Sequence, residues 1–204
     1  FYMGLGNSLQ TAQASAGSAG STRGVFGGGS TAGYFNTIDY ITIATTGNAT
    51  DFGDLTVARN YSGGLADATR GVFGSGLTSS GQVNVMDYIT ISTPSNATDF
   101  GNLTFVTYLV AGLADTTRGV FAGGSGQNVM DYITIATTGN AIDFGNLTVA
   151  RTALAGSSNG TRGVFGAGSV SNIIDYITIA TTGNATDFGD LTVAREELAT
   201  ASSI

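Results

Sequence analysis

The chain has 204 residues, of which 42% are hydrophobic and 10% are charged, and all seven of its basic residues are Arg. Without His, Cys or Lys it cannot hold a Ser/His/Asp or Cys/His catalytic group, a zinc site made of imidazole or thiolate, or a Walker phosphate loop. Its 14 acidic residues give a net charge of -7, which opposes binding to nucleic acid.

The apolar segments of the chain are short. The longest uncharged one, residues 103–114, is well below the roughly 20 residues that a membrane-spanning helix needs. The 32 glycines are distributed among these segments, and there is a single proline. This pattern predicts many short strands joined by tight turns, with no insertion into a membrane.

Two short motifs, "TRGVF" and "DY", recur along the chain at intervals of 44–48 residues. The arginines of the first motif are Arg23, Arg70, Arg118 and Arg162, and the aspartates of the second are Asp39, Asp87, Asp131 and Asp175. Four repeat units therefore fill nearly the whole chain.

Each unit contains four apolar segments separated by turn residues. In chain order, the first examples are residues 22–29, 36–44, 49–59 and 61–67. The segment "TIDYITIA" is apolar on both alternating faces, and its Thr and Ile residues favour extended backbone. We therefore expect four short antiparallel strands per unit, covered on both faces by neighbouring units.

The most regular stretch is "DYITIATTGNATDFG", residues 39–53, in which an interval of twelve residues separates the Asp of "DY" from the Asp of "DF" in every unit. We interpret it as two strands and the turn between them, with Gly47 and Asn48 in the turn. Packing against the next unit would fix the interval. The stretch is thus expected to be structural and not catalytic.

The unit resembles the kelch repeat in the order of its parts. An apolar strand ends in a glycine cluster ("GVFGGG"), a variable loop follows, then a strand with an aromatic residue ("NTIDYITI"), and then a large aromatic that opens the next strand. The unit differs in its shorter glycine clusters and in having Phe where kelch repeats usually have Trp, at Phe52, Phe100, Phe144 and Phe188. The resemblance implies an all-β, kelch-like β-propeller of four-stranded antiparallel blades.

We expect a single repeat domain over the 204 residues, with four full repeats of 44–48 residues and an N-terminal strand of a partial blade. The expected parts are the partial strand at 1–11, blades at 12–59, 60–107, 108–151 and 152–195, and a tail at 196–204. A ring of five or more blades, a longer parent chain, and association of copies into a homo-oligomer all stay open.

The phrase "DYITIATTGNATDFGDLT" is similar to repeats of virion-associated and tail-associated proteins of marine bacteriophages, especially cyanophages. This resemblance implies a non-enzymatic structural or adhesion module without a cofactor, located in the virion or outside the cell. Its expected partners are other virion proteins or a host-surface glycan. A bacterial lectin-type propeller is the alternative, and an enzyme that cleaves glycans with Asp and Glu is a third class, for which no unique acidic pair stands out.

The recurring Arg and Asp allow two interpretations. The structural one is an ion pair, or Arg-to-carbonyl hydrogen bonds, that satisfies buried polar groups between blades. The functional one is a ring of Arg that lines a channel for an anion. Asn48, Thr50, Asp51 and Asp54 offer oxygen ligands for calcium, but their spacing matches no known calcium loop, and we expect no metal site.

The units differ most between their second and third segments. These variable loops are at residues 28–36, 76–84, 123–128 and 167–172. Loops on a repeated scaffold often carry recognition, although sequence drift gives the same pattern. We expect the contact surface at Tyr34, Phe35, Gln82 and Gln127, with the two aromatic residues placed to stack on a sugar or to enter a protein interface.

Overall fold

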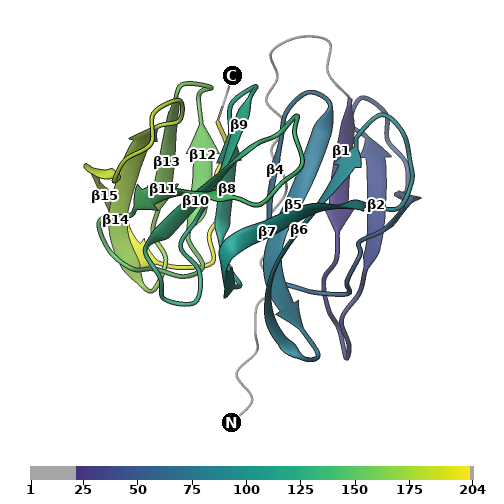
Figure 1. Ribbon diagram of the computed structural model, residues 1–204, viewed down its shortest axis with the longest axis horizontal. Coiled ribbons are helices and arrows are strands. Elements are labelled where there is room, and N and C mark those ends of the chain that lie inside the picture. Colours follow the sequence, from purple (N-terminus) through teal and green to yellow (C-terminus); the bar gives the residue numbers. More distant parts are fainter. Residues whose placement is uncertain (1–21, 203–204) are drawn as a thin grey trace.

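The computed structural model describes residues 22–202, which contain strands and no helix (Figure 1). The strands form four antiparallel sheets of three or four strands, which confirms the expected all-β fold. The predicted strand at residues 1–11 and the beginning of the first expected blade lie outside the described residues. Within the described range, no helix is long and apolar enough to cross a membrane.

The sheets are numbered I to IV in chain order. Sheet I contains β1 (Arg23–Gly27), β2 (Thr37–Thr42) and β3 (Thr50–Asp54). Sheet II contains β4 (Gly63–Ala66), β5 (Arg70–Thr78), β6 (Gly81–Thr90) and β7 (Thr98–Thr107). Sheet III contains β8 (Ala111–Ala114), β9 (Arg118–Ala122), β10 (Val129–Thr134) and β11 (Ile142–Asn146). Sheet IV contains β12 (Ala155–Ser158), β13 (Arg162–Gly166), β14 (Ser171–Thr178) and β15 (Thr186–Arg195), and in every sheet consecutive strands pair.

Sheet II differs from the prediction of a loop at residues 76–84. β5 continues to Thr78 and β6 begins at Gly81, so that Leu77 pairs with Gln82 and only a two-residue turn remains. The loop prediction was therefore wrong for most of this segment. The physical reason is that Leu77 also pairs with Asn60, which extends β5 beyond the end of its counterparts.

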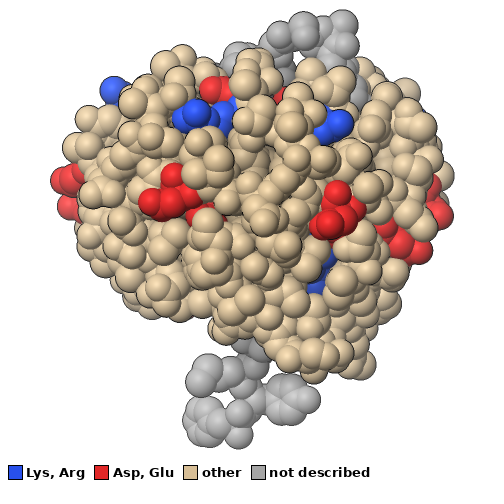
Figure 2. All heavy atoms as spheres, viewed as in Figure 1, with Lys and Arg blue, Asp and Glu red and all other residues tan. Residues whose placement is uncertain are grey.

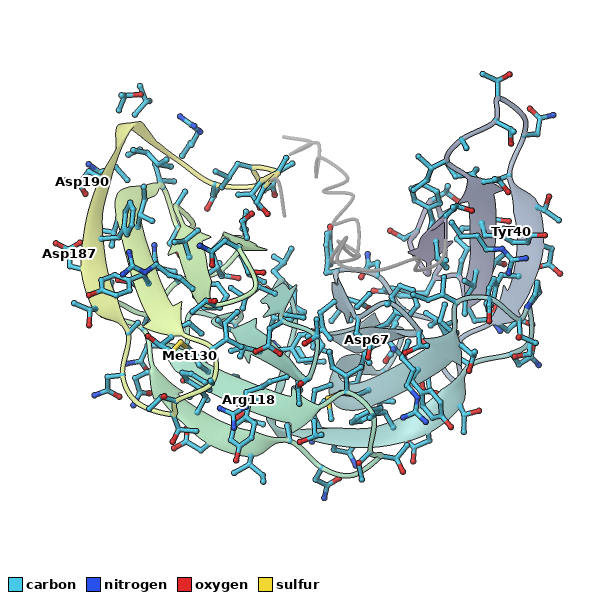
Figure 3. The ribbon with its side chains drawn as sticks, turned by 90° about the horizontal axis from the view of Figure 1, so that it is seen from above. Tyr40, Asp67, Arg118, Met130, Asp187 and Asp190 are labelled. Atoms are coloured by element: carbon cyan, nitrogen blue, oxygen red, sulfur yellow. The ribbon has the colours of Figure 1, made fainter. Side chains whose placement is uncertain are left out.

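The four sheets follow one another along an open arc, with Tyr40 of sheet I near one end and Asp187 and Asp190 of sheet IV at the other (Figure 3). The first strands β4, β8 and β12 contact one another in turn. Each of the three hydrophobic clusters contains residues of two neighbouring sheets. The core therefore lies in the junctions between sheets, named I/II, II/III and III/IV below.

Junction II/III illustrates this packing. Met86 and Phe100 of sheet II meet Phe121 and Ile133 of sheet III, and all four side chains are buried. Burial of a side chain of this size stabilises a fold by about 1.5–3 kcal/mol. A junction of this composition is therefore sufficient to fix one sheet against the next.

A β-bulge turns the Phe of "DFG" toward the next sheet. In sheet II, Met86 pairs with Gly101 and Asp87 pairs with Asp99, so Phe100 has no partner in register. The same register shift occurs in the other three sheets. Because a bulge redirects one side chain, it lets Phe100 enter the junction while the strand remains paired.

The Gly of "DFG" is required by the approach of the next sheet. Gly101 has a φ of 136°, and a Cβ at this position would overlap the carbonyl oxygen of Gly139 in the following sheet. Gly139 in turn donates its N–H to the carbonyl of Phe100 at 2.7 Å. The stretch from "DY" to "DFG" thus forms two strands whose turn docks on the preceding sheet.

Candidate binding site at the variable-loop end of the sheets

The recurring Arg of "TRG" links one sheet to the next. Its guanidinium carbon lies 4.3–4.6 Å from the centroid of the "DY" Tyr ring of its own sheet. Its Nη1 donates to a backbone carbonyl of the following sheet, and the pairs are Arg23 with Ile91, Arg70 with Ile135 and Arg118 with Ile179, at 2.9–3.1 Å. Arg162, in the last sheet, stacks on Tyr176 but has no such acceptor among the described residues.

The recurring Asp of "DY" is held by the preceding sheet. A Thr donates its backbone N–H and its hydroxyl to the carboxylate, and the pairs are Thr56 with Asp87, Thr104 with Asp131 and Thr148 with Asp175. Asp39 belongs to the first sheet and has no preceding sheet in the described range. The three internal aspartates are almost fully buried.

Two of these aspartates also form buried ion pairs. Arg59 Nη1 lies 2.8 Å from Asp87 Oδ2, and Arg151 pairs with Asp175, with all four side chains 0% exposed. Burial lowers the pKa of Arg59 and Arg151, while the facing carboxylates act in the opposite direction. These arginines come from "LTVAR", so the Arg of "TRG" and the Asp of "DY" do not pair with each other.

Junction II/III lacks this ion pair because Thr107 stands where Arg59 and Arg151 stand in the other units. Burial raises the pKa of Asp131, and the hydrogen bonds from Thr104 oppose that rise. The repeated polar residues thus join neighbouring sheets at every junction. At junction II/III the buried carboxyl of Asp131 has no ion-pair partner among the described residues.

One residue considered for calcium, Asp54, and the counterparts of another, Asn48, form hydrogen bonds between neighbouring sheets. Asp54 donates its backbone N–H to the side-chain oxygen of Asn96 in the next sheet at 3.1 Å, and Asn140 and Asn184 accept equivalent bonds. Among residues 22–202 no group of three or more acidic side chains is arranged to hold a metal ion.

The face in Figure 2 shows acidic and basic side chains in small separate groups on a mostly uncharged surface.

A hollow of about 550 Å³ lies where the variable loop of sheet I meets sheet II. It is lined by Ser30, Thr31, Ala32, Gly33, Tyr34, Asn60, Tyr61 and Leu77. The loop closes on itself, because Ser30 pairs with Tyr34 and the N–H of Phe35 donates to the carbonyl of Gly29 at 2.9 Å. The hollow therefore has a defined wall of short polar side chains and an aromatic ring.

Asn60 fixes the loop of sheet I to sheet II. Its backbone exchanges two hydrogen bonds with Leu77, at 3.0 and 2.9 Å, and its Nδ2 donates to Ser30 Oγ at 2.9 Å. Its Oδ1 is buried without a hydrogen-bond partner. Asn60 thus positions the floor of the hollow against the loop that forms its wall.

Tyr61 provides a second aromatic ring. Its backbone has a φ of 55°, a conformation that positions 109, 153 and 197 share in the other connections. The ring lies 6.0 Å from the ring of Tyr108, at an interplanar angle of 50°. Tyr34 and Tyr61 therefore face the hollow from two different sheets.

The predicted contact residues do not form one site. Tyr34 lines the hollow, whereas Phe35 is exposed on the same loop outside its lining. Gln82 lies in β6 and accepts a hydrogen bond from Ser125 of sheet III at 2.9 Å. Gln127 has an exposed side chain, and its backbone carbonyl accepts a hydrogen bond from the backbone N–H of Arg151.

Sequence reasoning missed Asn60 and Tyr61. Both lie in the connection between β3 and β4, and Tyr61 was expected to begin a strand at residues 61–67. The signal was nevertheless present, because the pair reads "NY" at 60–61 but "YL", "TA" and "EE" at the equivalent positions of the other units. Sequence differences between the units thus occur in the connections between sheets as well as in the variable loops.

The sequence was compared with models of protein families and with curated proteins, and neither comparison gives a match.

Proposed function

We propose that this chain is a non-enzymatic structural and adhesion module, a kelch-like β-propeller or part of one, in a phage virion or tail. In this proposal sheets I to IV are blades, and the variable-loop end contacts a host-surface glycan or another virion protein. The positions of two kinds of residue support this proposal. Side chains that recur in every unit pack the junctions, and side chains that differ between units line the hollow.

The observation that carries the proposal is the hollow with Tyr34 and Tyr61 on its walls. Aromatic rings offer flat apolar faces to the C–H side of a sugar ring or to an apolar partner side chain. Ser30, Thr31 and Asn60 add hydroxyl and amide groups that donate to and accept from sugar hydroxyls. A few polar groups around an apolar surface are typical of ligand sites.

The bacterial lectin is the second candidate, because the same hollow suits a free glycan. A lectin-type propeller would repeat its site at each junction. The residues at positions 60 and 61 differ from those at 108–109 and 152–153, which favours one contact site over several equivalent ones. The phage module is preferred because the phrase "DYITIATTGNATDFGDLT" resembles repeats of virion-associated and tail-associated proteins.

A glycan array tests the contact site. The chain is expected to bind a restricted set of glycans, and Tyr61→Ala and Tyr34→Ala should each weaken binding tenfold or more, since about 1.4 kcal/mol corresponds to a factor of ten. Val106→Ala is the control, because Val106 is exposed on β7 and does not line the hollow. If both tyrosine variants bind glycan as tightly as the unaltered chain, the hollow is not the contact site.

A separate experiment tests whether the protein is located in the phage particle. Purified phage particles, washed and analysed by mass spectrometry, should contain peptides of this chain in a constant ratio to the major capsid protein. Its absence from particles, together with glycan binding at the hollow, would favour the free lectin.

A further inference from the structure

The three junctions are built from the same pair of faces. The forward face of a sheet is the one turned toward the next sheet in the chain, and the rear face is turned toward the preceding one. The forward face carries the Phe of "DFG", which is 2% exposed at Phe52, Phe100 and Phe144. The rear face carries the last Ile of "DYITI", which is at most 4% exposed at Ile91, Ile135 and Ile179.

Among residues 22–202, no further sheet covers the forward face of sheet IV. Phe188 is 53% exposed, in contrast to its three buried counterparts. Arg195 is exposed, whereas Arg59 and Arg151 at the same position are fully buried. Leu191 is half-buried although its counterparts are buried. This face thus presents the apolar and basic residues of a junction without the opposing sheet.

The rear face of sheet I likewise has no sheet packed against it in the part of the chain that the structure describes. Ile43 is 68% exposed and Phe26 is 37% exposed, while their counterparts in the other sheets are buried. Asp39, the first "DY" aspartate, is half-buried and lies on β2 of this sheet. The two ends of the arc therefore carry the two opposite halves of one junction (Figure 3).

The backbone beyond β15 enters the position of a further first strand. Glu197 donates its N–H to the carbonyl of Ala153 at 3.0 Å, as Ala153 does to Leu109 at 3.1 Å. Ser202 Oγ donates to the carbonyl of Ser158 at 2.7 Å, as Ser158 Oγ does to Ala114 at 2.6 Å. The chain therefore repeats the geometry of a junction past sheet IV.

We propose that the forward face of sheet IV binds the rear face of sheet I of a second copy of this chain, in a head-to-tail contact that repeats the internal junctions. Phe188 of one copy then packs against Ile41 and Ile43 of the other. Arg162 donates to the carbonyl of Ile43, as Arg118 donates to that of Ile179. The contact buries two exposed apolar surfaces that the same repeat buries three times internally.

The polar residues at the two ends match in charge. Thr192 and Arg195 occupy the positions of Thr148 and Arg151, which hold Asp175 across junction III/IV. On the opposite end, Asp39 occupies the position of Asp175. A junction forms without this Arg, as Thr107 shows in junction II/III, so Arg195 is not needed to fold its own sheet. Its pairing with Asp39 of a second copy gives the exposed cation an anionic partner.

A contact between two different faces is heterologous, and it leads to a closed ring if the rotation closes and to a filament if it does not. This geometry makes a specific prediction for variants. A copy with a damaged forward face still offers its rear face, and a copy with a damaged rear face still offers its forward face. Only a mixture of the two can then associate.

The experiment measures molar mass by sedimentation and light scattering over a range of concentrations. The unaltered chain, whose monomer has a mass of 20.5 kDa, is expected to form dimers or larger species as concentration rises. Phe188→Glu and Ile43→Glu should each remain monomeric, and an equimolar mixture of the two should form dimers and nothing larger. Phe35→Glu is the control, because it places the same charge on an exposed Phe outside both faces, and it should associate like the unaltered chain.

Circular dichroism establishes that each variant is folded, which is expected because both substituted side chains are exposed. A monomeric unaltered chain at all concentrations overturns the proposal. So does association of either single variant at the unaltered level, or a mixture that stays monomeric. None of these results bears on glycan binding at the hollow, so the two proposals fail independently.

Discussion

The carboxylate of Asp131 accepts hydrogen bonds from the backbone and the hydroxyl of Thr104 and has no arginine beside it, unlike Asp87 and Asp175 at the other junctions. The same motif thus holds its aspartate in two electrostatic settings within one chain. This difference provides matched variants in which only the ion pair changes.

The first prediction compares Asp131→Asn with Asp175→Asn. The second variant leaves Arg151 buried without its partner, which should cost about 3–5 kcal/mol of unfolding free energy. Asp131→Asn removes a buried unpaired carboxyl, and it should change stability at neutral pH by about 1 kcal/mol or less. Urea unfolding of both variants measures the difference. Equal losses would show that the ion pair contributes nothing at junction III/IV.

The raised pKa of Asp131 also sets the direction of a pH dependence. The folded state binds this proton more tightly than the unfolded state, whose carboxyl has the ordinary pKa of 3.8. Stability attributable to this group is therefore greatest in acid and declines as pH rises from the ordinary pKa through the raised one. Subtracting the thermal midpoints of Asp131→Asn from those of the unaltered chain at each pH should isolate this decline.

The second prediction restores the missing cation by Thr107→Arg. Gly76 lies against the side chain of Arg59, and Gly124 lies against Thr107 in the same way, so the surroundings of Thr107 resemble those of Arg59. The new guanidinium should lower the pKa of Asp131. The loss of stability that this group causes as pH rises should then become smaller. Thermal unfolding of this variant and of the unaltered chain at the same pH values measures that loss, and an unchanged profile would contradict the assignment.

The third prediction compares Gly101→Ala with Gly189→Ala. Gly101 has a φ of 136° and Gly189 a φ of 132°. Alanine at either position therefore strains the backbone, at a cost of about 1–3 kcal/mol. Only at Gly101 does the added Cβ overlap the next sheet, because nothing lies within 4 Å of a Cβ at Gly189. Gly101→Ala should therefore be less stable than Gly189→Ala, as judged by urea midpoints. Equal midpoints would argue against a close contact at junction II/III.

The fourth prediction compares Arg118→Ala with Arg162→Ala. Both remove a guanidinium that stacks on a Tyr, but only Arg118 also donates to the next sheet, at Ile179. A charged hydrogen bond of this kind contributes about 1.5–3 kcal/mol. Arg118→Ala should lower the thermal midpoint more than Arg162→Ala does. Equal losses from the two variants would mean that the stacking, and not the link between sheets, carries the effect.

The strands of "DYITIATTGNATDFG" were predictable from sequence because their Thr and Ile residues favour extended backbone and the interval between "DY" and "DF" is fixed. The structure has these strands at Thr37–Thr42 and Thr50–Asp54 in the first unit. The bulge that turns Phe52 was not predictable, because the sequence pattern indicates two paired strands but not which residue is left without a partner in register.

The pairing of charges was beyond sequence reasoning for a similar reason. Three of the four units contain two arginines and the second unit contains one, and spacing alone does not say whether Arg70 or Arg59 meets Asp87. That choice is made by the contact between sheets. The hollow has the same origin, since Tyr34 and Tyr61 belong to different units and meet only when sheets I and II pack together.

The central claim is that the repeated motif holds neighbouring sheets together, and Phe144→Ala beside Phe188→Ala tests it most directly. The two residues occupy the same position of the motif, but Phe144 is buried at junction III/IV and Phe188 is on the open end. Phe144→Ala should cost about 3–5 kcal/mol and Phe188→Ala about 1 kcal/mol or less, in urea unfolding at a concentration where light scattering shows monomers. Equal losses from the two variants would contradict the account.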